Sequence, residues 1–379
     1  MENRLQNMFG KEIHKTRNWC VISKFILTGA LFLTACDAPV SEEKFETDND
    51  EVRIDQLISG YAQGTSYTII TGDDSLLVSQ QEIDNLLKDF DTSLSSYIPE
   101  SIVSRFNVAS PGVYYFDDQQ QYFQQCIEES MRVYDRTKGA FDPTVYPLVA
   151  GWGFLKDPGM EMDQHIVDSL LAMTGFRSGI DFDYKNLGDG RFSLTKKKQG
   201  LRMDFNAIAQ GLSVDVVAKY LEEKGHENYF VEIGGEVRVK GRNREGHFWR
   251  IGVDAPKESN DGRDEIRDIT NVVNLRGGAV ATSGNYRKYY EKDGIKYSHT
   301  INPVTGYPVQ HTLLSATVWS AQASTSDAYA TAFMVMGTEK AMEFLETNSD
   351  LHLEVLLIFT NKKGRMEKFF TPGMKRFLD

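Results

Sequence analysis

The stretch AQGLSVDVVAKYLEEKG (209–225), followed by the short runs YFVEI (229–233), EVRVKG (236–241) and WRIGV (249–253), decides the fold class. The first stretch predicts a helix, because its apolar residues recur on one face and it ends at a glycine. The three runs predict strands, and the Gly-Gly pair between the first two predicts a hairpin turn. A helix leading into hairpins favours an α+β fold over regular βαβ alternation.

The rest of the chain supports this class. Residues 257–268 are so charged that we expect an exposed loop. We predict an α+β fold of mixed, largely antiparallel sheets with packed helices. Further helices are predicted at 80–97, 121–139, 324–337 (with Ser/Thr caps) and 338–348, and further strands within 61–74, at 296–299 and at 353–359.

Composition and charge exclude several classes of protein. The 379 residues carry a formal net charge of −12, and such an acidic chain does not attract nucleic-acid phosphates. With 41% hydrophobic and 25% charged residues, the chain has the composition of a globular protein with a substantial core. Its length fits one large domain or two moderate ones.

The N-terminal segment has the pattern of a targeting signal. Residues 1–24 are basic, and the apolar run FILTGALFLTA (25–35) is far shorter than the ~20 residues that span a bilayer. We therefore expect a signal peptide at 1–35. LTAC (33–36) resembles the lipobox of bacterial lipoproteins, which implies lipidation of Cys36 after export. The alternatives are a signal peptide in which the nearby cysteine is incidental, and a short buried helix.

The expected mature chain begins with an acidic tether at 36–52, followed by a folded domain at 53–379. Membrane attachment through Cys36 is expected, and Asp37 indicates the periplasmic face of an inner membrane. Cys126 is then the one thiol outside the targeting segment and the lipidation site, so an intramolecular disulfide is excluded.

The common catalytic signatures are missing. The sequence has no GxxxxGK[ST] loop, no GxGxxG motif opening a helix, no HExxH, no paired CxxC and no GxSxG. A P-loop nucleotide hydrolase, a Rossmann dehydrogenase and a zincin are therefore disfavoured, as is an α/β-hydrolase.

Asp327 and Thr331 are the candidate metal ligands. They are four residues apart in a predicted helix, so both side chains project from one face. A carboxylate and a hydroxyl at this spacing can reach one Mg²⁺ ion. The same spacing also suits an aspartate favoured by the helix dipole and a packed threonine.

Three further residues are candidates for the site, each with a structural explanation beside it. His299 lies between hydroxyl residues beside a Pro/Gly turn, which suits a general base, although a lone histidine is more often structural. Asp142 precedes a proline and indicates at least a rigid loop. Asp204 precedes the 209–225 helix, where it can cap the helix or bind a ligand N–H.

Taken together, the motifs resemble the ApbE family of FAD:protein FMN transferases. The resemblance covers most of the expected mature chain and runs in one order along it. It lies in QGTSYTI (63–69), LSSYIPESIVSRFN (94–107), GAFDPTVYPLV (139–149), DFNAIAQGLSVD (204–215), VEIGGEVRVKG (231–241), ATSGNYRKYY (281–290), SHTINPVTGYP (298–308) and SDAYATAFMVMG (326–337).

The resemblance implies an enzyme that binds FAD with Mg²⁺, attaches FMN to a threonine or serine of a target protein and releases AMP. Position 210 departs from many members, which have a charged residue there. Acceptors in the family are membrane subunits of ion-pumping redox complexes or secreted flavoproteins. The implied FAD contacts are Gln63, Tyr97, Ala140, Phe141, Asp142, Asp204, Gln210 and His299, and the implied metal ligands are the Ala207 carbonyl, Asp327 and Thr331.

We expect His299 and Asp327 to be catalytic. The acceptor hydroxyl must lose its proton, and an imidazole, with an ordinary pKa of ~6.5, can accept it. Two other activities suit the same residues: a Mg²⁺-dependent FAD pyrophosphatase, in which water replaces the acceptor, and a lipoprotein that binds FAD without catalysis. The carrier would need neither Asp327 nor Thr331.

Overall fold

The computed structural model describes residues 56–72, 77–154, 161–256, 268–285, 289–292 and 295–378. The predicted signal peptide, Cys36 and the tether lie outside the described residues, as do residues 257–267 of the predicted exposed loop. Within the described ranges, no helix combines the length and apolar character needed to cross a membrane.

The centre of the fold is an eight-stranded sheet in which all neighbours are antiparallel. The prediction of a largely antiparallel α+β fold is therefore confirmed. The strand order is β1 (Gln56–Ala62), β2 (Thr65–Thr71), β6 (Tyr229–Ile233), β7 (Glu236–Lys240), β10 (Gly277–Gly284), β13 (Leu313–Ser320), β14 (Glu354–Thr360) and β15 (Met366–Phe370).

Three smaller sheets, nine α-helices and one short 3₁₀ helix (Ser349–Leu351) complete the described part of the chain. The sheets are β3 (Gly112–Asp117) with β5 (Arg191–Lys196) and β4 (Phe182–Gly188), β8 (Trp249–Asp254) with β9 (Ile269–Leu275), and β11 (Tyr289–Lys292) with β12 (Ile295–Ser298). The helices are α1 (Gln80–Leu94), α2 (Ile102–Val108), α3 (Tyr122–Arg136), α4 (Tyr146–Gly151), α5 (Gln164–Leu171), α6 (Ala209–Glu223), α7 (Ala323–Met336), α8 (Thr338–Thr347) and α9 (Pro372–Phe377).

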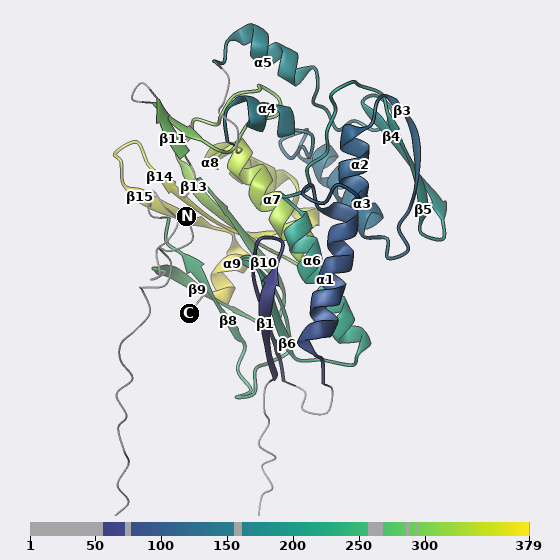
Figure 1. Ribbon diagram of the computed structural model, residues 1–379. Helices are drawn as coiled ribbons and strands as arrows, with labels where there is room; N and C mark the ends of the chain where they lie inside the picture. The colour runs from purple at the N-terminus through teal and green to yellow at the C-terminus, as the bar shows by residue number, and fades with distance from the viewer. Residues whose placement is uncertain are drawn as a thin grey trace, which may run out of the picture. The chain divides into compact units, whose positions relative to one another are not determined.

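The two faces of the central sheet are covered differently. Helices α6 and α7 pack on one face, and α1 and α3 pack against these helices in turn (Figure 1). On the opposite face, Val237 and Val239 of β7 pack with apolar residues of β8, β9 and α9. Since side chains alternate along a strand, Glu236 and Arg238 of β7 face the helices.

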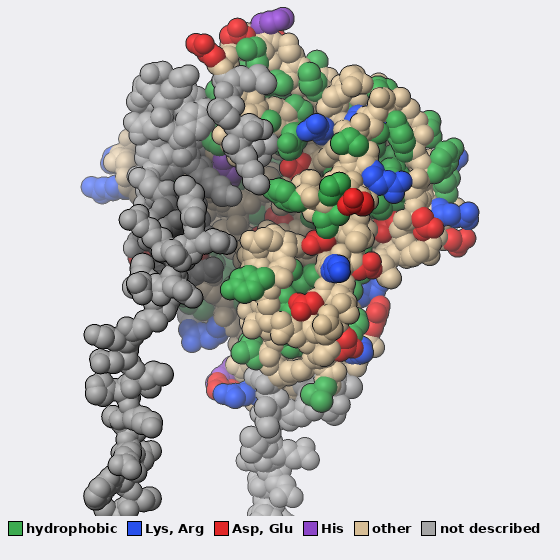
Figure 2. All heavy atoms as spheres, viewed as in Figure 1, with side chains coloured by type: hydrophobic (Ala, Val, Ile, Leu, Met, Phe, Trp, Pro, Cys, Tyr) green, Lys and Arg blue, Asp and Glu red, His purple; other side chains and the backbone are tan. Residues whose placement is uncertain are grey.

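The distribution of charged side chains on the surface agrees with the prediction that the chain does not attract nucleic acid. Figure 2 shows basic and acidic side chains interspersed with hydrophobic ones over the helical side. This face therefore presents no continuous basic surface of the kind that binds nucleic acid.

The local turn signals of the sequence are confirmed. Gly225 adopts a φ of +94° after the end of α6, the left-handed conformation that ends helices. Gly234 and Gly235 form the two-residue turn between β6 and β7, both with positive φ. The predicted Ser/Thr cap of α7 is wrong, because its N-cap residue is Gln322 and makes no side-chain cap.

Helices α6 and α7 approach each other most closely at Gly211. A Cβ added there would overlap with the Ala323 carbonyl and lie 2.8 Å from the Ser324 nitrogen. Both obstacles are backbone atoms and cannot rotate away. Gly211 is therefore needed for the spacing of the two helices.

We predict that Gly211→Ala lowers the free energy of unfolding by about 1–3 kcal/mol, the usual cost of overpacking. The alanine's better helix propensity, worth up to ~1 kcal/mol, opposes this loss. The control is Gly277→Ala, where the nearest atom to an added Cβ is 3.9 Å away. Urea denaturation measures both, and a Gly211→Ala protein as stable as the control would contradict the close approach.

Candidate active site

The candidate site lies where the first turn of α6 meets the second turn of α7. Asp327 reaches from α7 to α6, and its Oδ2 accepts a hydrogen bond from the Gly211 N–H at 3.2 Å. Gly211 is the third residue of α6, and the N–H groups in the first turn of a helix have no partner within that helix. Asp327 therefore supplies a side-chain cap to α6, whose own N-cap residue, Ile208, makes none.

Asp327 is almost entirely buried, with 6% of its surface exposed. Burial raises the pKa of its carboxyl to about 7, and the Gly211 N–H opposes this shift. A nearby positive charge would therefore stabilise the ionised form of this carboxylate.

Thr331 lies one turn further along α7, as the sequence predicts. Its Oγ1 is 3.3 Å from the Oγ of Ser283, near the end of β10. The contact places the hydroxyl of Thr331 at the interface of α7 and the central sheet, where α7 and β10 pack together.

Two predicted FAD contacts lie on the other side of the α6 start. Gln63 is in the two-residue turn between β1 and β2, with a φ of +54°, and its Oε1 is 3.2 Å from the Ser213 Oγ. The side chain of Gln210 covers Gly234, so closely that a Cβ on that glycine would overlap with it. The structure therefore brings Gln63 and Gln210 together around the first turns of α6.

The loops of Asp142 and Asp204 form a second group. The Asp204 N–H donates to the Pro143 carbonyl at 2.7 Å, which joins the loops. The Asp142 Oδ1 accepts from the Thr144 N–H at 2.7 Å and from its hydroxyl at 2.5 Å. Burial raises the pKa of the Asp142 carboxyl to about 6, against the hydrogen bonds of Thr144.

Asp204 does not cap α6, which corrects one of its two sequence interpretations. Its Oδ1 accepts from the Asn206 N–H at 2.9 Å, whereas the N-cap residue of α6 is Ile208 and makes no side-chain cap. This Asx turn shapes the chain just before α6. Burial raises the pKa of the Asp204 carboxyl.

Ala140 and Phe141 are buried, and Phe141 belongs to the main hydrophobic core. Phe141 is 2% exposed, so its side chain supports the loop from within. Tyr97, in contrast, is 79% exposed after α1. Within the described part of the chain, no hydrogen bond joins Tyr97 to the other predicted contacts.

His299 is half-buried and follows β12 directly. The next residue, Thr300, donates to the Asn285 side chain at 2.5 Å, and the Asn285 N–H donates to the Leu314 carbonyl at 3.0 Å. Asn285 is two residues from Ser283, the contact of Thr331. The His299 segment is therefore attached to the same end of β10 as Thr331, one of the candidate metal ligands.

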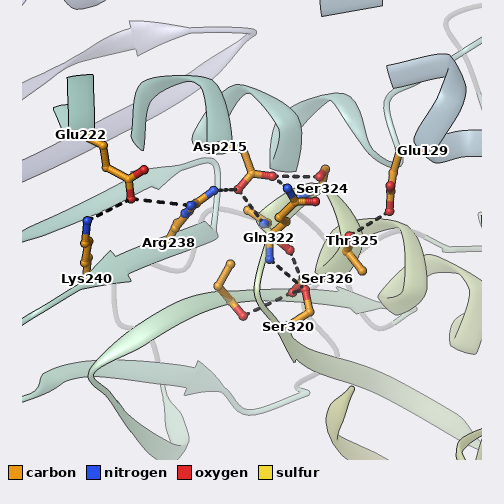
Figure 3. Close-up of polar contacts among 12 residues, drawn as sticks. Glu129, Asp215, Glu222, Arg238, Lys240, Ser320, Gln322, Ser324, Thr325 and Ser326 are labelled. Atoms are coloured by element: carbon orange, nitrogen blue, oxygen red, sulfur yellow. Dashed lines mark hydrogen bonds and ion pairs between the residues drawn. The ribbon is translucent and has the colours of Figure 1, made fainter. Parts of the chain in front are cut away.

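The position of Asp327 depends on a buried polar network at the start of α7 (Figure 3). Asp215 of α6 accepts from the backbone N–H groups of Ala323 and Ser324, both at 2.9 Å, and from the Ser324 hydroxyl at 2.8 Å. Asp215 therefore supplies the N-terminal cap that α7 lacks locally.

Arg238 of β7 completes this network. Its guanidinium donates to the Asp215 Oδ1 at 2.7 Å and lies 3.8 Å from Glu222 (Figure 3). The negative charge of Asp215 raises the pKa of Arg238, although burial opposes it. Arg238 of β7 pairs with Asp215 of α6, and Asp215 in turn accepts the N–H groups at the start of α7. These two side chains thus join the central sheet, α6 and α7.

Glu236 is a candidate residue that the sequence analysis missed. It is the first residue of β7, faces the helices and is 8% exposed. Burial and, second, the negative charge of Asp327 raise the pKa of its carboxyl well above the usual value. The sequence feature that could have identified Glu236 is a charged residue directly after the Gly-Gly turn, at a strand position that faces the helices.

The described ranges contain no group of three or more His, Cys, Asp and Glu side chains suited to a metal. A cation bound by the Asp327 carboxylate would therefore need oxygen ligands from other kinds of group as well. A backbone carbonyl and a hydroxyl are donors of this kind.

Comparison with known proteins places this geometry in a family. Residues 63–357 match the sequence profile of the ApbE family. An FAD:protein FMN transferase of Vibrio cholerae is 34% identical over 366 residues, covering 96% of this chain and 99% of the relative. The protein of the same description from Haemophilus influenzae is 35% identical over 320 residues, or 82% and 88% of the two chains.

Solved structures agree. The flavin transferase ApbE from Vibrio cholerae superposes with a TM-score of 0.71 at 35% identity, covering 86% of this chain and all of the other. The apo form of the Pseudomonas stutzeri flavinyl transferase ApbE gives a TM-score of 0.72 at 29% identity, covering 86% and 97%.

We predict that Asp215→Asn lowers the free energy of unfolding by about 3–5 kcal/mol, because it leaves the charge of Arg238 without its close partner. The matched control is Glu222→Gln, which removes the longer ion pairs of Arg238 and Lys240, keeps an acceptor for the Tyr229 hydroxyl and should cost less than about 1 kcal/mol. Equal losses for the two variants in chemical denaturation would contradict a central role for Asp215.

Proposed function

This chain belongs to the ApbE family and is an FAD:protein FMN transferase, and we propose that it acts through a Mg²⁺ site of Ala207, Asp327 and Thr331. FAD is the substrate and a protein is the acceptor. The reaction cleaves the pyrophosphate of FAD, forms a phosphoester between FMN and an acceptor hydroxyl, and releases AMP.

The observation that carries the cation site is the hydrogen bond from Gly211 to Asp327. It sets a buried carboxylate beside the first turn of α6, which begins two residues after Ala207. A carboxylate, a carbonyl and the Thr331 hydroxyl are hard oxygen donors, and Mg²⁺ takes few protein carboxylates. These residues fit the ion, which, when bound, neutralises pyrophosphate charge and stabilises the leaving phosphate.

FAD binding is assigned to the residues around this site. Gln63 and Gln210 border the start of α6, and their amides can donate to and accept from a polar ligand. Asp142 and Asp204 lie on two joined loops. The exposed ring of Tyr97 is suited to stacking on an aromatic ring system. Ala140 and Phe141 are buried and so hold the loop that carries Asp142 against the core.

His299 is the proposed general base. Its segment is tied to the end of β10, near Thr331, and it is half-buried rather than enclosed. The acceptor hydroxyl transfers its proton to the imidazole while its oxygen attacks the phosphorus of the FMN moiety. The bond to the AMP phosphate breaks in the same displacement.

The location of the enzyme is a separate part of the proposal. A basic segment, a short apolar run and LTAC (33–36) support export and lipidation of Cys36. Residues 36–52 would then hold the domain near the membrane, within reach of membrane acceptors such as subunits of ion-pumping redox complexes. Fatty-acid labelling that persists in a Cys36→Ser variant would exclude this anchor.

The transfer experiment incubates the full chain with FAD, Mg²⁺ and an acceptor domain that carries a flavinylatable threonine. The acceptor should gain the mass of one FMN less water, and EDTA should abolish the gain. His299→Asn should retain FAD binding while transfer falls by roughly 10²–10⁴-fold, the usual contribution of a general base. Intact mass spectrometry and FAD fluorescence measure the two quantities.

Each opposite result has a distinct meaning. FMN and AMP released without a change in acceptor mass would indicate a pyrophosphatase, and bound but uncleaved FAD would indicate a carrier. Undiminished transfer by His299→Asn would exclude the histidine as the base without affecting the cation site.

A further inference from the structure

Glu236 lies at the candidate cation site but has no role in the proposed function so far. It begins β7 after the tight turn at Gly234 and Gly235, and it faces the helices that carry Asp327. Only 8% of its surface is exposed. Burying a carboxylate is costly, so such a residue needs a compensating partner.

The charged neighbours of Glu236 are engaged elsewhere. Arg238, two residues along β7, pairs with Asp215 and Glu222, and Lys240 pairs with Glu222. The Glu232 carboxylate accepts the Gly235 N–H at 2.8 Å. Among the described residues, no ion pair links a basic side chain to Glu236 or to Asp327, and the buried Glu236 Oε2 has no hydrogen-bond partner.

Glu236 and Asp327 lie on β7 and α7, two elements that pack together. Two neighbouring carboxylates, both more than nine-tenths buried, repel each other unless a cation or a proton lies between them. The Asp327 Oδ2 accepts the Gly211 N–H, and Asp327 is the first carboxylate of the proposed cation site. The unpartnered oxygen of Glu236 is therefore the remaining acidic donor on this side of the site.

We propose that Glu236 is the second carboxylate of the cation site, so that the protein holds the cation before FAD binds. This inference rests on the proposed function. Mg²⁺ commonly binds one or two protein carboxylates. With Asp327 alone, the divalent ion would keep a net positive charge and depend on the FAD pyrophosphate for neutralisation; a second carboxylate removes this dependence.

The test measures cation binding without FAD and without turnover. The purified full chain is titrated with Mn²⁺, which binds Mg²⁺ sites and is followed by electron paramagnetic resonance. Wild type should bind one ion, and Glu236→Gln should weaken its affinity by about 10–100-fold or more, since altering even a residue that only supports a metal ligand has an effect of this size. The control Glu232→Gln, on the same hairpin, should stay within about twofold of wild type, as its carboxylate has its own partner.

Asp327→Asn separates this inference from the proposed function. If Asp327→Asn abolishes Mn²⁺ binding while Glu236→Gln binds as wild type does, Glu236 is not a ligand and the cation site stands. If Asp327→Asn also binds normally, the cation site itself is wrong. Should Glu236→Gln lose its fold by circular dichroism, Glu236→Met, which keeps a similar length but has no carboxylate, replaces it, and wild-type Mn²⁺ affinity in that variant overturns the proposal.

Discussion

The hydrogen bond from the Gly211 N–H to Asp327 determines how the rest of the site is arranged. It requires the close approach of α6 and α7, which only a glycine at position 211 permits. It also caps the first turn of α6, whose N–H groups have no partner within the helix. One contact therefore brings a carboxylate to the start of α6, close in sequence to Ala207.

The surrounding structure holds this contact in place through charge as well as packing. Asp215 caps α7 from the neighbouring helix and is itself paired with Arg238 of the central sheet. The start of α7 is thus tied to two other elements, and Asp327 lies within the following turn. Rigid support of this kind suits a site whose ligands must stay close to their binding geometry.

Local sequence signals predicted much of this arrangement. Apolar periodicity and glycine positions gave α6 and the β6–β7 hairpin with nearly correct bounds, since both depend on nearby residues. The four-residue spacing placed Asp327 and Thr331 on one face of α7. The cap of α7 was not predictable, because Asp215 lies 108 residues from Ala323 in the sequence. Glu236 was missed because its burial depends on packing of β7 against helices distant in sequence.

The most direct test of the account is the position of a cation at the start of α6. Crystals of the protein soaked with Mn²⁺ and measured at the manganese absorption edge would locate the ion by anomalous scattering. We predict a single peak bounded by the Ala207 carbonyl, the Asp327 carboxylate and the Thr331 hydroxyl, with the Gly211 N–H still bonded to Asp327. A peak elsewhere, or a Gly211 N–H that no longer bonds to Asp327, would contradict it.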